Sequence, residues 1–88
     1  MKIIAVARKE LKEALLKGGV DEVFTAKDGL EAYSILKELH ENESADMILV
    51  EKALADAIGQ KKIVEMKMRK TLPLIVVIET DVPSLRGF

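Results

Sequence analysis

Carboxylates that follow apolar segments are the first residues of this sequence that could do chemistry. Glu51 follows one such segment, and Glu79 and Asp81 follow another. Paired carboxylates can act as general acid and base, or they can hold Mg²⁺. Lys27 and Lys52 are close enough in sequence to neutralise them, and no nucleophile accompanies them. We therefore interpret these acids as solvated charges at strand ends, and we predict no catalytic residue and no metal site.

The single histidine, His40, is the second candidate. It lies among Glu38, Glu41 and Glu43 near the end of a polar helical pattern. A catalytic or metal-binding histidine needs groups that orient its ring, and glutamates can supply them. The last turn of a helix also favours a cation through the helix dipole. We predict that His40 is an exposed residue of that last turn.

Glycines could form a phosphate-binding loop, but their position argues against it. Gly18 and Gly19 follow a helical pattern that ends at Lys17. Glycine is favoured directly after a helix, whereas a phosphate needs backbone amides at the start of one. We interpret the pair as a helix stop and expect no nucleotide or other cofactor.

A basic segment near the carboxyl-terminal third is the remaining candidate. It combines lysines and arginine with two methionines, which can form an adaptable surface for a protein partner. An ordinary amphipathic helix with a solvated face explains the same pattern. Loops at strand ends are a second place for partner recognition. The partner-binding candidates are Glu51 and Lys52 at a strand end, and Lys62, Met66 and Arg69 in the basic segment.

Composition limits the class of protein. The chain has 88 residues, 49% of them hydrophobic and 33% charged, which suits one small soluble domain. A net charge of −1 gives no electrostatic case for nucleic acid. The apolar run 3–7 is too short to span a membrane, and there is no cysteine for a disulfide. We expect a cytoplasmic protein without direct membrane insertion.

Apolar runs alternate with helical patterns along the whole chain. The continuous run 74–78 is rich in β-branched residues, as expected of a buried strand. Asp28 with Glu31 three residues later is close to a capping box at a helix start. The predicted strands are 3–7, 20–25, 47–50 and 74–78. The predicted helices are 9–17, a second helix with Asp28 as its N-cap, 53–58 and 61–70.

This order predicts a small three-layer α/β sandwich, in which a four-stranded parallel sheet of the flavodoxin or receiver type has helices on both faces. We assign residues 1–80 to one domain and residues 81–88 to an irregular carboxyl-terminal tail.

Two segments resemble a response-regulator receiver domain. Residues 26–32 (AKDGLEA) match its A-x-D-G-x-E-A segment, and residues 45–50 (ADMILV) match its D-x-I-L-x-D strand. The phosphate-accepting aspartate of that family corresponds here to Glu51, and Arg8-Lys9 stand where its metal-binding acids belong. Thr80 could match its switch hydroxyl. This resemblance implies a degenerate receiver-like module for signalling or protein interaction that lacks phosphorylation.

A second resemblance covers more of the chain. Residues 16–24 (LKGGVDEVF), 47–58 (MILVEKALADAI) and 72–78 (LPLIVVI) are similar, in order and spacing, to segments of the F subunit of V-type and archaeal-type ATPases. The family's G-D motif after the first strand is replaced by Ala7-Arg8. The resemblance implies a four-stranded parallel sheet and a non-catalytic role on the central rotor. It also implies a helical partner, the D subunit of the rotor shaft, and a place in a membrane-bound complex that couples ATP turnover to ion transport.

Overall fold

Four parallel strands form a single sheet in the computed structural model, which describes residues 1–79. The sheet order is β2-β1-β3-β4. The strands are β1 (Ile3–Ala7), β2 (Glu22–Thr25), β3 (Met47–Glu51) and β4 (Leu74–Ile78). The helices are a 3₁₀ turn η1 (Lys9–Leu11), α1 (Lys12–Lys17), α2 (Gly29–Glu41), α3 (Lys52–Ile58) and α4 (Gln60–Arg69). The predicted α/β fold is confirmed, and the predicted tail 81–88 lies outside the described residues.

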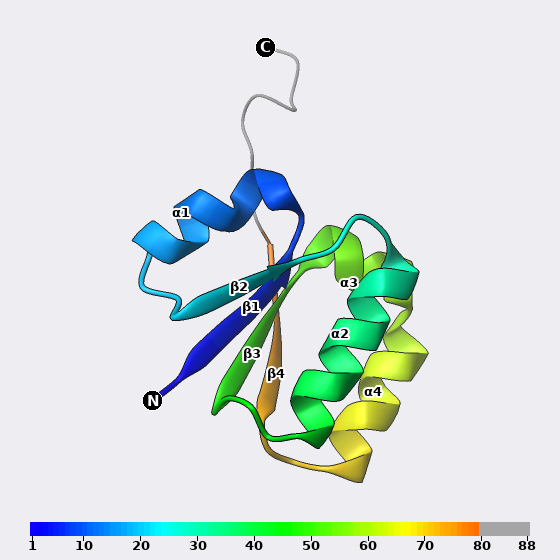
Figure 1. The fold of residues 1–88 in the computed structure, drawn as a ribbon. Coiled ribbons are helices and arrows are strands. Elements are labelled where there is room, and N and C mark those ends of the chain that lie inside the picture. The colour runs from blue at the N-terminus through cyan, green and yellow to red at the C-terminus, as the bar shows by residue number, and fades with distance from the viewer. Residues whose placement is uncertain (80–88) are drawn as a thin grey trace.

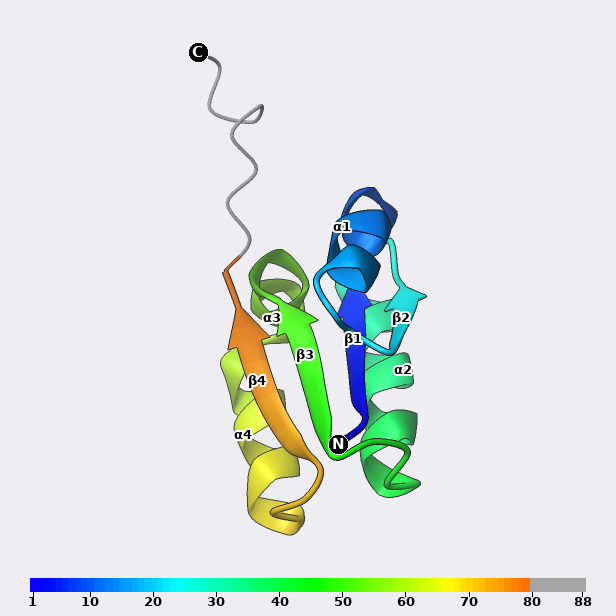
Figure 2. The same ribbon diagram turned by 90° about the vertical axis from the view of Figure 1, so that its left-hand side faces the viewer.

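Helices cover the two faces of the sheet unequally. Figures 1 and 2 show α2, α3 and α4 on one face and α1 on the other, so the predicted three layers are present. The main core lies between the sheet and the three helices. Alternate strand residues supply its sheet side, because successive side chains of a strand point to opposite faces. These residues are Ile4 and Val6 of β1, Ile48 and Val50 of β3, and Ile75 of β4.

The ends of the helices follow the predicted signals with small differences. The Asp28 carboxylate accepts the backbone N–H of Glu31 at 2.9 Å, which caps α2 as expected. The Glu31 carboxylate accepts the N–H of Lys27 at 2.9 Å, one residue before the position of a true capping box. Gly19 has φ 106° beyond the end of α1, and Gly59 separates α3 from α4 with φ 102°. Both glycines occupy backbone conformations that other residues rarely adopt.

The buried stripe of α2 is rotated relative to the predicted one. The sequence predicts Leu30, Tyr33, Leu36 and Leu39 on the inner face. Leu36 and Leu39 are buried, but Leu30 is 80% exposed. Ala32 takes the innermost place at 0% exposure, and its small side chain lets the helix lie close to the sheet. The face that α2 turns to the sheet therefore includes Ala32 in place of Leu30.

His40 is buried, so the predicted exposed position is wrong. Its exposure is 2%, and Nε2 has no hydrogen-bond partner among the described residues. The reason is helical spacing: His40 continues the inner face four residues after Leu36, which itself follows Ala32 by four. Glu38 and Glu41 lie on other faces of α2, and Glu43 follows the end of the helix.

Replacing His40 with leucine is expected to raise the free energy of unfolding by about 1 kcal/mol. Leucine keeps much of the buried volume and removes a buried nitrogen that has no partner, which ordinarily costs about 1–3 kcal/mol. Urea denaturation of His40→Leu checks this. The control, His40→Gln, keeps a buried polar group and should not be stabilising. A His40→Leu protein less stable than the wild type would contradict the expectation.

Candidate functional site

The carboxyl ends of the strands define the candidate site. The chain goes from β1 outward to β2, and then crosses to β3 and β4 on the other side of β1. The strand order therefore reverses between β1 and β3. In open α/β sheets, ligands bind outside the carboxyl ends at such a reversal point. Arg8 directly follows β1, and Glu51 is the last residue of β3.

Arg8 and Glu51 bind each other at this position. Glu51 Oε1 accepts the backbone N–H of Arg8 at 2.8 Å, and Oε2 accepts from Arg8 Nε at 2.8 Å. Oε2 also forms an ion pair with Nη2 of the same guanidinium. The Glu51 side chain is 1% exposed, whereas that of Arg8 is 38% exposed. The hydrogen bond that the Arg8 guanidinium donates to Glu51, reinforced by the negative charge of Glu51, raises the pKa of Arg8.

The pair changes the interpretation of Glu51. The sequence predicts a solvated strand-end charge, but the structure buries this carboxylate and engages both of its oxygens. The correction has a simple cause. β3 is a central strand, and the residue after the neighbouring β1 lies over its end with an opposite charge. Glu79 is exposed, and Thr80 and Asp81 lie outside the described residues.

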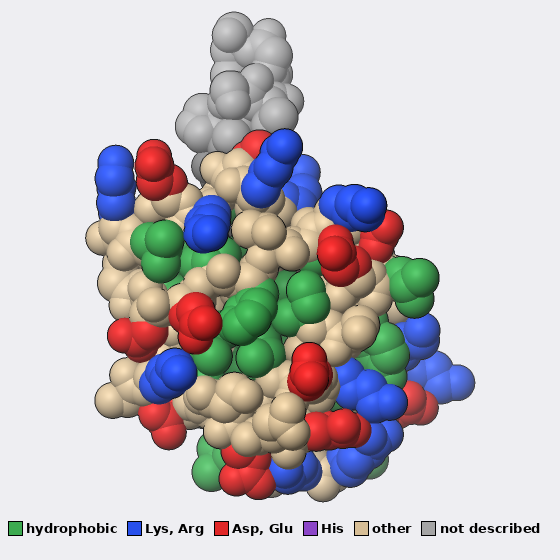
Figure 3. Space-filling view, in the orientation of Figure 1, with side chains coloured by type: hydrophobic (Ala, Val, Ile, Leu, Met, Phe, Trp, Pro, Cys, Tyr) green, Lys and Arg blue, Asp and Glu red, His purple; other side chains and the backbone are tan. Residues whose placement is uncertain are grey.

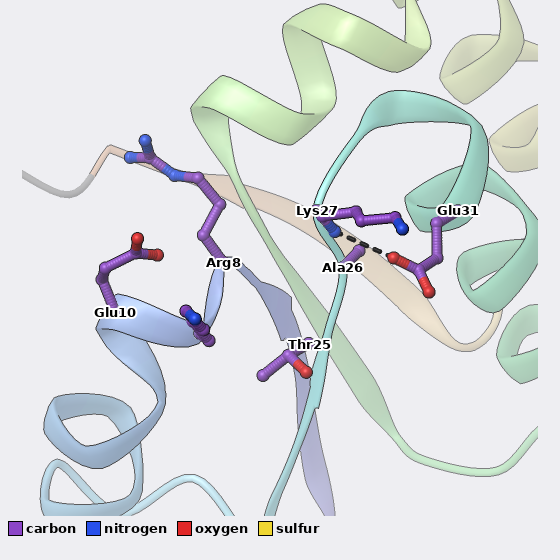
Figure 4. Close-up of a pocket in the computed structure, with 7 residues that line it drawn as sticks. Arg8, Glu10, Thr25, Ala26, Lys27 and Glu31 are labelled. Carbon is purple, nitrogen blue, oxygen red and sulfur yellow. Dashed lines mark hydrogen bonds between the residues drawn. The ribbon is translucent and has the colours of Figure 1, made fainter.

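A shallow pocket of about 400 Å³ lies beside the pair, at the ends of β1 and β2. Figure 4 shows Thr25 and Lys27 on one side and Glu10 on the other, while the Arg8 guanidinium points away from Thr25 and Lys27. Thr25 is the one hydroxyl among the described lining residues, and no imidazole or thiol is among them. Apart from Thr25 and Ala26, the residues that line the pocket are charged.

The start of α2 faces this pocket, but its amides are partly occupied. The N–H of Glu31 is held by Asp28, and the N–H of Lys27 is held by Glu31. An incoming anion would have to displace two carboxylates to reach those donors. The helix start is therefore capped by the chain itself, which leaves less of the positive helix end for a phosphate.

Two of the five predicted partner-binding residues are buried. Glu51 belongs to the Arg8 pair, and Met66 is 3% exposed in the core. Lys52 is half exposed, and its Nζ donates a hydrogen bond to a carboxylate oxygen of Asp56 at 2.9 Å. This hydrogen bond raises the pKa of Lys52. Binding by these residues stays a prediction. Because Glu51 and Met66 are buried, they can affect partner binding only by supporting the surface residues that cover them.

The other two predicted residues face α2. Lys62 Nζ lies 4.8 Å from the centre of the Tyr33 ring, and Arg69 Nη1 lies 3.6 Å from a Glu41 carboxylate oxygen. Both side chains therefore reach toward α2. The sequence predicts the basic helix, but it does not predict which face of that helix contacts α2. Helical spacing separates that face from Val64 and Met68, which are exposed.

The surface in the orientation of Figure 1 carries charges of both signs. Figure 3 shows Lys and Arg interspersed with Asp and Glu around a central group of hydrophobic side chains. No single-sign patch dominates that view. Among the helices of residues 1–79, none has the length and apolar character that crossing a membrane requires.

Comparison with known proteins gives one match. The family model described as ATP synthase (F/14-kDa) subunit matches residues 3–87, nearly the whole chain. No curated protein and no solved structure matches the chain significantly.

Proposed function

This chain belongs to the ATP synthase (F/14-kDa) subunit family, which contains the F subunits of V-type and archaeal-type ATPases, and from this premise we propose that it is a non-catalytic part of the central stalk. In this role it binds the helical D subunit, which forms the shaft of the rotor. It then supports the coupling between ATP hydrolysis or synthesis and ion transport, on the cytoplasmic side of a membrane-bound complex.

The family match carries the proposal, and the site is compatible with it. The position where an open α/β sheet would hold a ligand is filled by the Arg8–Glu51 pair. Both carboxylate oxygens are engaged there, so Glu51 is poorly placed to act as a base or to receive a phosphoryl group. This arrangement favours a binding function for the domain.

Small size supports dependence on a partner. A domain of 88 residues buries a smaller share of its surface than a larger one, and its stability margin is correspondingly narrow. A partner that binds only the folded state adds to that stability. Binding to its partner in the complex would therefore also stabilise the folded state of this chain.

Mixing the chain with the cognate shaft subunit is expected to raise its melting temperature. With partner at a thousandfold excess over the dissociation constant, the gain is about 4 kcal/mol. For a domain of this size each kcal/mol corresponds to roughly 4–8 °C. Calorimetry and co-elution by gel filtration measure the effect.

An unrelated coiled-coil protein of similar charge is the control, and it should cause no shift. If the cognate shaft subunit neither co-elutes with the chain nor shifts its melting temperature, the central-stalk function is wrong.

A further inference from the structure

Exposed hydrophobic residues are concentrated around β4. Of the nine large hydrophobic residues that are exposed in residues 1–79, six belong to α4, β4 and the loop between them. Scattered exposed hydrophobics are normal, but a contiguous group marks an interaction site. The six are Val64, Met68, Leu72, Leu74, Val76 and Val77.

β4 is an edge strand without the usual protection. It pairs with β3 on one side, and no strand of residues 1–79 pairs with its other side. All five of its residues are hydrophobic, and it contains neither charge nor proline. Natural edge strands ordinarily carry such features, because they prevent pairing with other chains. This edge is therefore open to an additional strand.

Apolar side chains are exposed on both sides of the β4 backbone. Ile75 and Val77 point toward α3 and α4, and Leu74 and Val76 point to the opposite face of the sheet. In Figure 2, no helix lies in front of β3 and β4 on that opposite face within the described residues. A docked helix would cover one of these faces, whereas a strand beside β4 would border both.

A groove lies beside the strand on its helical side. It measures about 230 Å³, and its lining includes Ala55 of α3, Val64 and Lys67 of α4 and Val77 of β4. Met68 follows Val64 by four residues and continues the same outer face of α4. Side chains of an added strand would enter this groove and meet apolar side chains together with Lys67, Lys52, Asp56 and Gln60.

The backbone of β4 presents donors to the open side. The N–H of Leu74 donates to the carbonyl of Asp46 at 3.1 Å, toward β3. Because hydrogen-bonding direction alternates along a strand, the N–H groups of Ile75 and Val77 point outward.

We propose that β4 pairs with a strand contributed by a protein partner, which extends the sheet to five strands. The partner strand carries apolar residues on both faces and an acidic residue opposite Lys67. Main-chain hydrogen bonds supply affinity, and the groove supplies specificity, as in other cases of strand addition. Only the identity of the partner, the shaft subunit, rests on the proposed function.

Charge disfavours a second copy of this chain as the occupant. Antiparallel pairing of two β4 strands would bring the two α4 helices side by side. Lys67, which lines the groove and forms no ion pair within residues 1–79, would then face the same lysine of the other copy. An acidic partner segment would meet attraction at the same place.

Val77→Pro tests the pairing. Proline removes an outward N–H that β3 does not use, and it is tolerated at edge strands. We expect at least a tenfold loss of affinity for the shaft subunit in calorimetric titration. The control, Leu30→Lys, removes a hydrophobic residue of α2 that is more exposed than Val77 (80% against 40%) and should bind as the wild type does. Lys67→Glu should also weaken binding, most clearly at low salt.

Amide hydrogen exchange of the wild-type complex gives a second readout that does not depend on any variant. The amides of Ile75 and Val77 should exchange at least tenfold more slowly in the complex than in the free chain. Shaft binding without this protection overturns the inference and leaves the proposed function standing. No binding by the wild type overturns both. A homodimer with protected Ile75 and Val77 amides would show that a second copy, not a partner, occupies the edge.

Discussion

Replacing Arg8 with alanine is expected to lower the free energy of unfolding by about 3–5 kcal/mol. The change leaves the Glu51 carboxylate almost fully buried with one remaining donor, the backbone N–H of residue 8. Removing one partner of a buried ion pair has a cost of this size, because the remaining charge stays out of water. Total stabilities of about 5–15 kcal/mol are usual, so the loss should be plain in urea denaturation followed by circular dichroism.

The reverse change should cost less. In Glu51→Gln the partner left behind is Arg8, whose side chain is 38% exposed and can turn to water. The double variant Arg8→Met/Glu51→Leu should recover most of the lost stability, since an apolar pair leaves no buried charge. An exposed pair, Lys52 with Asp56, is the control, and Lys52→Ala should lower the free energy of unfolding much less than Arg8→Ala does. Equal costs for Arg8→Ala and Lys52→Ala would show that burial of Glu51 is not the cause.

Gly29→Ala is expected to lower the free energy of unfolding by about 2–3 kcal/mol, although alanine is the better helix former by about 1 kcal/mol. A Cβ atom at Gly29 would lie 2.8 Å from the Cβ, carbonyl carbon and oxygen of Ala57. Two of those three atoms belong to the backbone, so the steric clash is removed only if α2 and α3 move apart. Thermal unfolding of the variant measures the effect.

Ala57→Gly in the same chain should restore part of the loss and not all of it, because it removes only the side-chain contact. Gly18→Ala is the control. The φ of Gly18 is −79°, and an added Cβ would meet nothing closer than 3.3 Å, so a change near zero is expected. A stabilised Gly29→Ala protein would mean that helix propensity outweighs the close approach of α2 and α3.

Local sequence patterns were enough to predict the helices and strands of this protein. The continuous apolar run of β4 has the predicted bounds, and Asp28 caps α2 as predicted. Gly59 divides the third helical region where the sequence places the break. These features depend on residues within one turn or one strand of each other. Strand propensity, capping and glycine conformations act over that range, which is why sequence alone determined them.

The site depended on contacts between residues far apart in sequence. Arg8 and Glu51 are separated by 43 positions, and only the parallel pairing of β1 with β3 brings them together. The sequence does show opposite charges at the ends of two predicted strands, which is a signal for a possible ion pair. It does not show that these two strands are neighbours in the sheet. His40 shows the same limit, since its burial depends on which face of α2 turns to the sheet.

Sequence alone thus determined the family resemblance, the order of strands and helices, and the presence of a basic helix near the carboxyl end. Tertiary structure decided how α4 is used: Lys62 and Arg69 turn to α2, and Val64, Lys67 and Met68 are left beside the open edge of β4. The physical reason is that a helical pattern fixes which residues share a face. Which face is covered depends on neighbours that only the folded chain brings into contact.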